Sequence, residues 1–164
     1  MTGLYYEQFK IGMEFKHSLT RTVTEMDNIM FCAMPHNPQP LHLDEEFCKK
    51  TEYGQRIVNS LFTLGLIIGV SVVETTLGTT LWNLGMTDVL FVKPVFHGDT
   101  IRAMTRVKEM RESKSRPNAG LVTFEHFGFN QRDEEVGYCV RTGLMMKQSS
   151  WWFVLGFLFL VTVN

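Results

Sequence analysis

The stretch NSLFTLGLIIGVSVV, residues 59–73, is apolar almost all round and contains no charged side chain. Its small positions are Gly65, Gly69 and Ser71. The pattern predicts a long helix, and a helix without a polar face has no side to turn toward water. We therefore expect this helix to be buried, with a sheet wrapped around it.

The chain after this helix predicts a run of β-strands. β-Branched, aromatic and alternating residues are concentrated in four segments, residues 80–91, 100–112, 121–131 and 135–147. Turn signals divide these segments at Pro94 with Gly98-Asp99, at residues 114–120 and at Arg132-Asp133. At the first turn, Pro94 ends one strand and Asp99 can accept backbone N–H bonds as the next strand begins.

The chain before the helix predicts one strand and two short helices. Alternation over residues 15–23 favours a strand, and Thr24 with its acidic neighbours is typical of the start of a helix reaching Cys32. Three prolines exclude helix from residue 35 to His42, and Asp44 is expected to cap a second helix ending near Lys50. A strand, a buried helix and antiparallel strands together predict an α+β fold.

Two motifs near the start of the long helix carry the candidate chemistry. Residues 37–44, Asn-Pro-Gln-Pro-Leu-His-Leu-Asp, place two amides and an imidazole on a loop stiffened by proline. Residues 54–60, Gly-Gln-Arg-Ile-Val-Asn-Ser, lead into the helix, whose first N–H groups have no partner within it. His42 can transfer protons near neutral pH, and a helix N-terminus stabilises negative charge. Together the motifs predict an active site.

These motifs resemble the catalytic signature of MaoC-like, (R)-specific enoyl-CoA hydratases, in which a segment of the form Asp-x-Asn-Pro-Leu-His carries the acid/base residues. The resemblance extends from about Tyr5 to Lys147 and includes a Pro-Val-x-x-Gly-Asp-Thr turn at residues 94–100. Residues 58–64, 83–85 and 111–118 are similar to the branch that contains mesaconyl-CoA hydratase. The resemblance implies a hot-dog fold, an antiparallel sheet wrapped around one long central helix, over residues 1–147.

The resemblance implies hydration of a short or branched enoyl-CoA thioester, or the reverse dehydration, with catalytic roles for Asn37, Gln39 and His42. Asn37 stands where the family has aspartate and Gln39 where it has asparagine, and a neutral amide does not transfer protons. Either His42 transfers the proton alone while the amides position water, or the site only binds acyl-CoA. We favour the first, because the mesaconyl-CoA hydratase branch also has an amide here. His36 and Asp44 are adjacent alternatives for a second titrating group.

Asn59 and Ser60 are the candidate ligands of the thioester oxygen. In the family, a backbone N–H at the start of the central helix binds this oxygen, and His-Gly is more common at the two positions. Ser60 keeps the N–H, while its side chain is expected to enter the pocket and favour small or polar acyl groups. The alternative is that Asn59 only caps the helix, as asparagine commonly does.

A basic loop is the candidate binding site for coenzyme A. Arg111, Lys114 and Arg116 cluster with Lys108 around the end of a predicted strand. Flexible cations of this kind bind phosphates, which coenzyme A carries. The simpler alternative is a solvated basic hairpin. The resemblance implies no separate cofactor, because coenzyme A enters as part of the substrate.

Composition excludes several other functions. The 164 residues are 45% hydrophobic with a formal net charge of −1, which suits one domain with a sizeable core and gives no basic excess for nucleic acid. Three widely spaced cysteines suit a reducing compartment, and no Cys/His spacing resembles a metal site. The first ten residues resemble no signal or transit peptide. We expect an intracellular protein, cytoplasmic or organellar, and a homodimer or an assembly of dimers.

Residues 148–164 form an apolar extension of unknown role. Its uncharged stretch from Trp151 to Val163 is shorter than the roughly twenty residues that a bilayer-spanning helix needs. Left exposed, it would be an aggregation-prone strand. We expect it to pack on its own domain or on a neighbouring subunit; a membrane tail and a misread gene boundary are the alternatives.

Two other functions fit the same fold. A hot-dog thioesterase usually brings a Glu or Asp to the central helix, whereas this helix has no carboxylate before Glu74. A non-catalytic acyl-CoA-binding or scaffold protein would retain the thioester without turnover. Assays that follow enoyl loss, thiol release and binding separate the three.

Overall fold

The computed structural model of the chain describes residues 3–148, so the stretch from Trp151 to Val163 lies outside the described residues. The helices are η1 (Tyr6–Gln8), α1 (Glu25–Ala33), α2 (Pro40–Leu43), α3 (Glu45–Cys48) and α4 (Ser60–Thr75), and the strands are β1 (Glu14–Lys16), β2 (Arg21–Thr22), β3 (Thr80–Leu90), β4 (Thr100–Glu112), β5 (Ala119–Phe129) and β6 (Glu135–Met146). Within residues 3–148, no helix has both the length and the apolar character to cross a bilayer.

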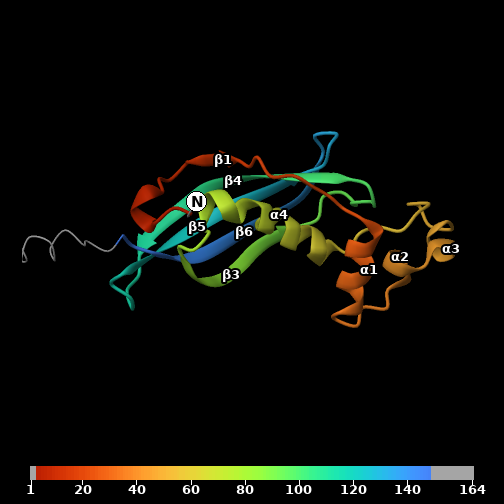
Figure 1. Cartoon of the computed structure of the whole chain (residues 1–164), viewed down its shortest axis with the longest axis horizontal. Coiled ribbons are helices and arrows are strands. Elements are labelled where there is room, and N and C mark those ends of the chain that lie inside the picture. The colour runs from red at the N-terminus through yellow and green to blue at the C-terminus, as the bar shows by residue number, and fades with distance from the viewer. Residues whose placement is uncertain (1–2, 149–164) are drawn as a thin grey trace, which may run out of the picture.

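One antiparallel sheet curves around α4, as Figure 1 shows. The strand order is β1-β4-β5-β6-β3, and β2 pairs with β4. The short helices α1, α2 and α3 gather beyond the N-terminal end of α4 (Figure 1). The α+β hot-dog fold expected from the sequence is confirmed.

Two strand glycines allow α4 to approach the sheet closely. A Cβ atom at Gly128 would lie 2.2 Å from the Ile67 Cδ1 atom, and one at Gly137 would lie 3.0 Å from it. A larger residue at Gly128 would therefore force the Ile67 side chain to move. Ile67 belongs to a buried cluster with Val23, Val58, Val70, Val95, Ile101, Ala103 and Val136. This cluster fixes the half of α4 that lies next to the candidate site.

In the single chain, α4 is buried on one side only, so the prediction of a fully buried helix is wrong. Leu64 and Ile67 face the sheet, but Leu61 is 61% exposed and Val73 is 41% exposed. The edge strand β3 also exposes apolar side chains, with Trp82 at 67% and Leu90 at 56%. An apolar edge strand with unpaired backbone groups is typical of a surface that docks another chain.

The strand predicted over residues 15–23 is interrupted, forming β1 and β2 with residues 17–20 between them. His17 turns inward, where its Nδ1 atom lies 2.6 Å from the Glu74 carboxylate and its Nε2 atom 2.8 Å from Thr105 Oγ1. Ser18 donates to Glu74 through both its backbone N–H and its hydroxyl. These bonds fasten the C-terminal end of α4 to β4 and take this part of the chain out of the sheet.

Two predicted helix caps are confirmed. Thr24 Oγ1 accepts from the Asp27 N–H at 3.2 Å, and Asp44 Oδ1 accepts from the Phe47 N–H at 2.9 Å. The exclusion of helix up to His42 is wrong, because α2 begins at Pro40. Proline is tolerated at a first helical position, where an N–H would have no partner within the helix. The resulting single turn carries His42.

Candidate active site

His42 is held in one ring orientation by the neighbouring loop. It lies half-buried on α2, with its Nδ1 atom 2.9 Å from the carbonyl oxygen of Ile57. A carbonyl only accepts hydrogen bonds, so Nδ1 carries the ring proton, and in the neutral imidazole Nε2 keeps its lone pair. The Ile57 N–H also donates to the Leu41 carbonyl at 3.0 Å. The arrangement leaves Nε2 as the nitrogen that can act as a base.

The start of α4 has two backbone N–H groups, those of Ser60 and Phe62, that make no hydrogen bond within residues 3–148. The Asn59 side chain caps the helix by accepting from the Leu61 N–H at 3.0 Å, and the Asn59 N–H donates to Asn28 Oδ1 at 2.9 Å. Asn59 is therefore the cap of the alternative interpretation, and Ser60, which lines a small pocket, keeps the N–H that the oxygen-binding prediction requires.

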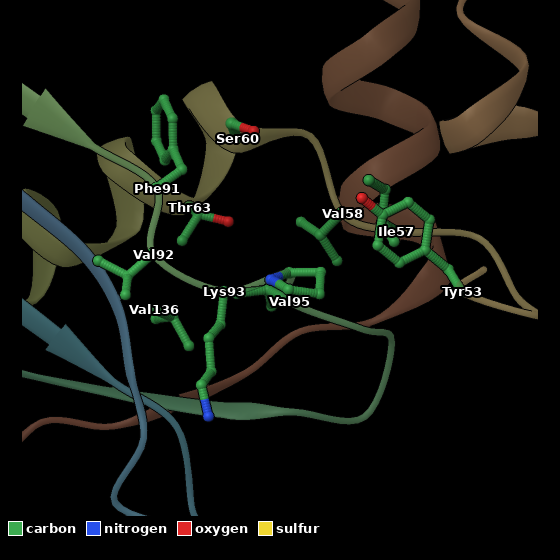
Figure 2. Close-up of a pocket in the computed structure, with 11 residues that line it drawn as sticks. Tyr53, Ile57, Val58, Ser60, Thr63, Phe91, Val92, Lys93, Val95 and Val136 are labelled. Atoms are coloured by element: carbon green, nitrogen blue, oxygen red, sulfur yellow. The ribbon is translucent and has the colours of Figure 1, made fainter. Parts of the chain in front are cut away.

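A small pocket is lined by Ser60 and by Ile57, whose carbonyl holds His42, while His42 itself is not part of the lining. Its volume is about 260 Å³, and its lining comprises Tyr53, Ile57, Val58, Ser60, Thr63, Phe91, Val92, Lys93, Pro94, Val95 and Val136. Figure 2 shows Ser60 and Thr63 on one side and Ile57, whose carbonyl holds His42, on the other. The Lys93 amine extends away from Ser60 (Figure 2) and lies 2.7 Å from the Glu134 carboxylate. The volume is at the small end of ligand pockets, which suits a short acyl group.

The predicted amides lie on the loop before α2 and bond locally. Asn37 Oδ1 accepts from the Gln39 N–H at 3.1 Å, and the Asn37 N–H donates to the Cys32 carbonyl at 2.9 Å. The Gln39 side chain is exposed. In the part of the chain that the structure describes, no hydrogen bond joins either side-chain amide to His42, although the His42 backbone N–H donates to the Gln39 carbonyl at 3.0 Å. The Asn37 carboxamide thus shapes the loop, with its NH₂ group left for a water or substrate.

Asn28 and His97 are site residues that the sequence did not single out. Asn28 is fully buried on α1, and its Nδ2 atom lies 3.0 Å from the His42 carbonyl oxygen and 3.1 Å from His97 Nε2. Burial, together with the charge of Arg56, lowers the pKa of His97. The sequence feature that could have identified Asn28 is its position as a polar residue directly before the apolar run from Ile29 to Ala33.

The basic loop does not join the His42 site within one chain. Arg111 lies at the end of β4, and Lys114 and Arg116 lie in the turn that follows. β4 has 13 residues, so its two ends are about 40 Å apart, and the pocket residues Pro94 and Val95 precede its other end. The loop forms a groove of its own with Trp82, Leu84, Ser113, Ser115, Leu121 and Leu144.

Known proteins resemble this chain in sequence and fold. Residues 7–128 match the family described as the MaoC like domain. A mesaconyl-CoA hydratase from Cereibacter sphaeroides is 28% identical over 148 residues, which are 90% of this chain and 43% of that protein. An (R)-specific enoyl-CoA hydratase from Rhodospirillum rubrum is 31% identical over 124 residues, covering 73% of this chain and 77% of that protein. A Mycobacterium tuberculosis structure with a double hotdog fold matches with a TM-score of 0.82 and 20% identity, covering 91% of this chain and 46% of that one.

Proposed function

Because the chain belongs to the MaoC-like domain family, we propose that it adds water to, or removes water from, a short or branched 2-enoyl thioester of coenzyme A. The observation that carries the proposal is the position of Ile57, which lines the same small pocket as Ser60 and whose carbonyl holds His42 with Nε2 left as the base. The chain spans less than half the length of the mesaconyl-CoA hydratase it matches, so the activity is proposed for this domain itself.

In this mechanism, His42 Nε2 accepts a proton from water while the water oxygen bonds to the β-carbon of the enoyl group. The electron pair of the double bond moves to the thioester, and the Ser60 N–H with the positive end of α4 stabilises the charge on its oxygen. The imidazolium then returns the proton to the α-carbon, which regenerates neutral His42. Dehydration follows the same steps in reverse.

The test is incubation of the pure protein with a panel of enoyl-CoA thioesters, including crotonyl-CoA and mesaconyl-CoA. Loss of enoyl absorbance without thiol release is the expected result. Release of the coenzyme A thiol would instead identify a thioesterase. The structure does not favour this outcome, because Glu74, the first carboxylate on α4, is already bonded to His17 and Ser18. Binding without either reaction would identify an acyl-CoA-binding protein.

Asn37 supplies a prediction about pH. The wild type is expected to show a single dominant ionisation in kcat/KM, from imidazole, because Asn37 does not titrate. Asn37→Asp keeps an acceptor for the Gln39 N–H and should keep or raise activity on crotonyl-CoA while adding a second, carboxylate ionisation. Asn37→Ala should be less active. A wild type inert on every enoyl-CoA, with an active Asn37→Asp variant, would mark the native site as one that only binds.

We also infer that two copies pair through β3, which brings the basic loop to the site. Paired strands related by a two-fold axis run antiparallel, so the start of one β3 lies beside the end of the other. The basic groove adjoins Trp82 near the start of β3, and the pocket adjoins Phe91 just after its end. Coenzyme A bound by the loop of one copy would therefore reach His42 of the other. The exposed apolar side chains of β3 and α4 support this pairing.

Replacing Arg111, Lys114 and Arg116 together with Ala should raise KM for crotonyl-CoA about tenfold or more with little change in kcat. Contacts to phosphate bind the ground state and the transition state alike. Steady-state kinetics measure both constants. Replacing the exposed residues Lys10, Lys16 and Lys50 with Ala removes the same charge and should leave KM unchanged. An unchanged KM in the first variant would make the loop a solvated hairpin.

A mixed dimer tests which copy supplies the loop. One copy carries His42→Ala and the other carries the three Ala substitutions in the basic loop. If the loop serves the other copy, one site of the mixed dimer is intact and turns over at the wild-type KM. If it serves its own copy, the residual activity shows only the raised KM.

A further inference from the structure

The Asn28 carboxamide lies where the two halves of the proposed site meet. Asn28 is 0% exposed, and its Oδ1 atom accepts from the Asn59 N–H at 2.9 Å. Its Nδ2 atom lies 3.0 Å from the His42 carbonyl oxygen. One side chain therefore binds the turn that carries the base and the residue that precedes the Ser60 N–H.

The orientation of the Asn28 amide follows from its partners. The His42 carbonyl requires a donor, and the Asn59 N–H requires an acceptor, so the amide oxygen and nitrogen cannot be exchanged. The amide nitrogen also lies 3.1 Å from His97 Nε2 and 3.4 Å from the Ile57 carbonyl oxygen, and because this nitrogen only donates, His97 Nε2 is the acceptor in their bond. A neutral His97 meets this requirement. The other charged groups that act on His97 are Arg56, Glu25 and Glu45.

Packing alone does not account for a buried amide at this position. A carboxamide transferred from water into a protein interior is unfavourable unless its groups are paired, and an aliphatic residue would fill the same face of α1. Here the amide oxygen and both amide hydrogens have partners, and those partners come from three segments that are separate in the sequence.

We propose that Asn28 is a positioning residue that fixes the His42 turn to the N-terminus of α4, and so sets the geometry between the base and the thioester-oxygen donor. Its effect on turnover rests on the proposed function, whereas its effect on the two segments can be measured without any reaction. Asn28 is fully buried, so it acts through His42 and Asn59 rather than on the substrate.

The test compares Asn28→Asp, Asn28→Ala and a matched control. Asn28→Asp keeps the acceptor for the Asn59 N–H and loses both donors, whereas Asn28→Ala loses every hydrogen bond of the side chain. Thr105→Val is the control, because Thr105 is also fully buried and bonds His17 and His126 in the middle of the sheet. Both Asn28 variants should lose up to about 100-fold in kcat, the scale of a small misplacement of catalytic groups. Their Kd for the saturated analogue butyryl-CoA should change little.

Two NMR measurements test the coupling in the absence of turnover. The Asn59 amide should be protected from hydrogen exchange in the wild type and in Asn28→Asp but not in Asn28→Ala. The carboxylate introduced by Asn28→Asp faces His97 Nε2 and favours the imidazolium, so the pKa of His97 should rise, and Thr105→Val should not move it.

The inference is overturned if His97 titration and Asn59 protection are the same in all variants, or if Thr105→Val loses as much kcat as Asn28→Ala. A wild type that hydrates no enoyl-CoA would reject the proposed function instead. In that case the two NMR measurements still decide whether Asn28 couples the segments.

Discussion

His42→Ala is expected to lower turnover of a hydratable enoyl-CoA by a factor of about 10²–10⁴, the contribution typical of general acid/base catalysis. The Ile57 carbonyl fixes the ring proton on Nδ1, so the variant removes a base that the fold has already oriented. Loss of enoyl absorbance in the steady state measures the effect.

Two controls separate chemistry from stability in this variant. The imidazole is half-buried and makes one hydrogen bond, so His42→Ala should fold with nearly the wild-type melting temperature. His36→Ala removes an exposed imidazole from the same loop and should keep full activity. If His42→Ala retained turnover within a few-fold of wild type, His42 could not be the proton-transfer group.

The fold was predictable where the sequence pattern is local and long. The alternating segments after Gly78 correspond to the four long strands, and the apolar stretch from Asn59 corresponds to α4. The interruption between β1 and β2 at His17 was not predictable, because the Glu74 side chain that binds His17 is 57 positions away in the chain. The exposed flank of α4 was also missed, since a buried apolar face and an exposed apolar face have the same composition.

The site was predictable in its residue types more than in their contacts. The motif around His42 and the start of α4 identified the region, but the sequence does not show that Asn59 is already bound on both sides, as a cap and to Asn28. The sequence also assigned Arg111 and its neighbours to coenzyme A without showing that the length of β4 separates them from His42. These contacts depend on which segments the sheet brings together, and no spacing in the sequence encodes that.

Ser60→Pro is expected to lower turnover by about 10²–10³, the effect of removing one donor to a developing oxyanion. Ser60 is the first residue of α4, where proline fits the helix and lacks only an N–H that makes no hydrogen bond within residues 3–148. Asn59 has φ −58° and ψ 128°, a conformation suited to the residue before proline. The substitution therefore deletes the proposed donor and leaves the backbone of the helix intact.

Ser60→Ala is the matched control, because it removes the hydroxyl and keeps the N–H. It should turn over crotonyl-CoA at nearly the wild-type rate, while Ser60→Pro should bind butyryl-CoA with a similar Kd and lose kcat, since the N–H bond strengthens as charge develops on the thioester oxygen. Equal activity in the two variants would show that another group holds this oxygen. It would remove Ser60 from the mechanism and leave the role of His42 to be decided by its own variant.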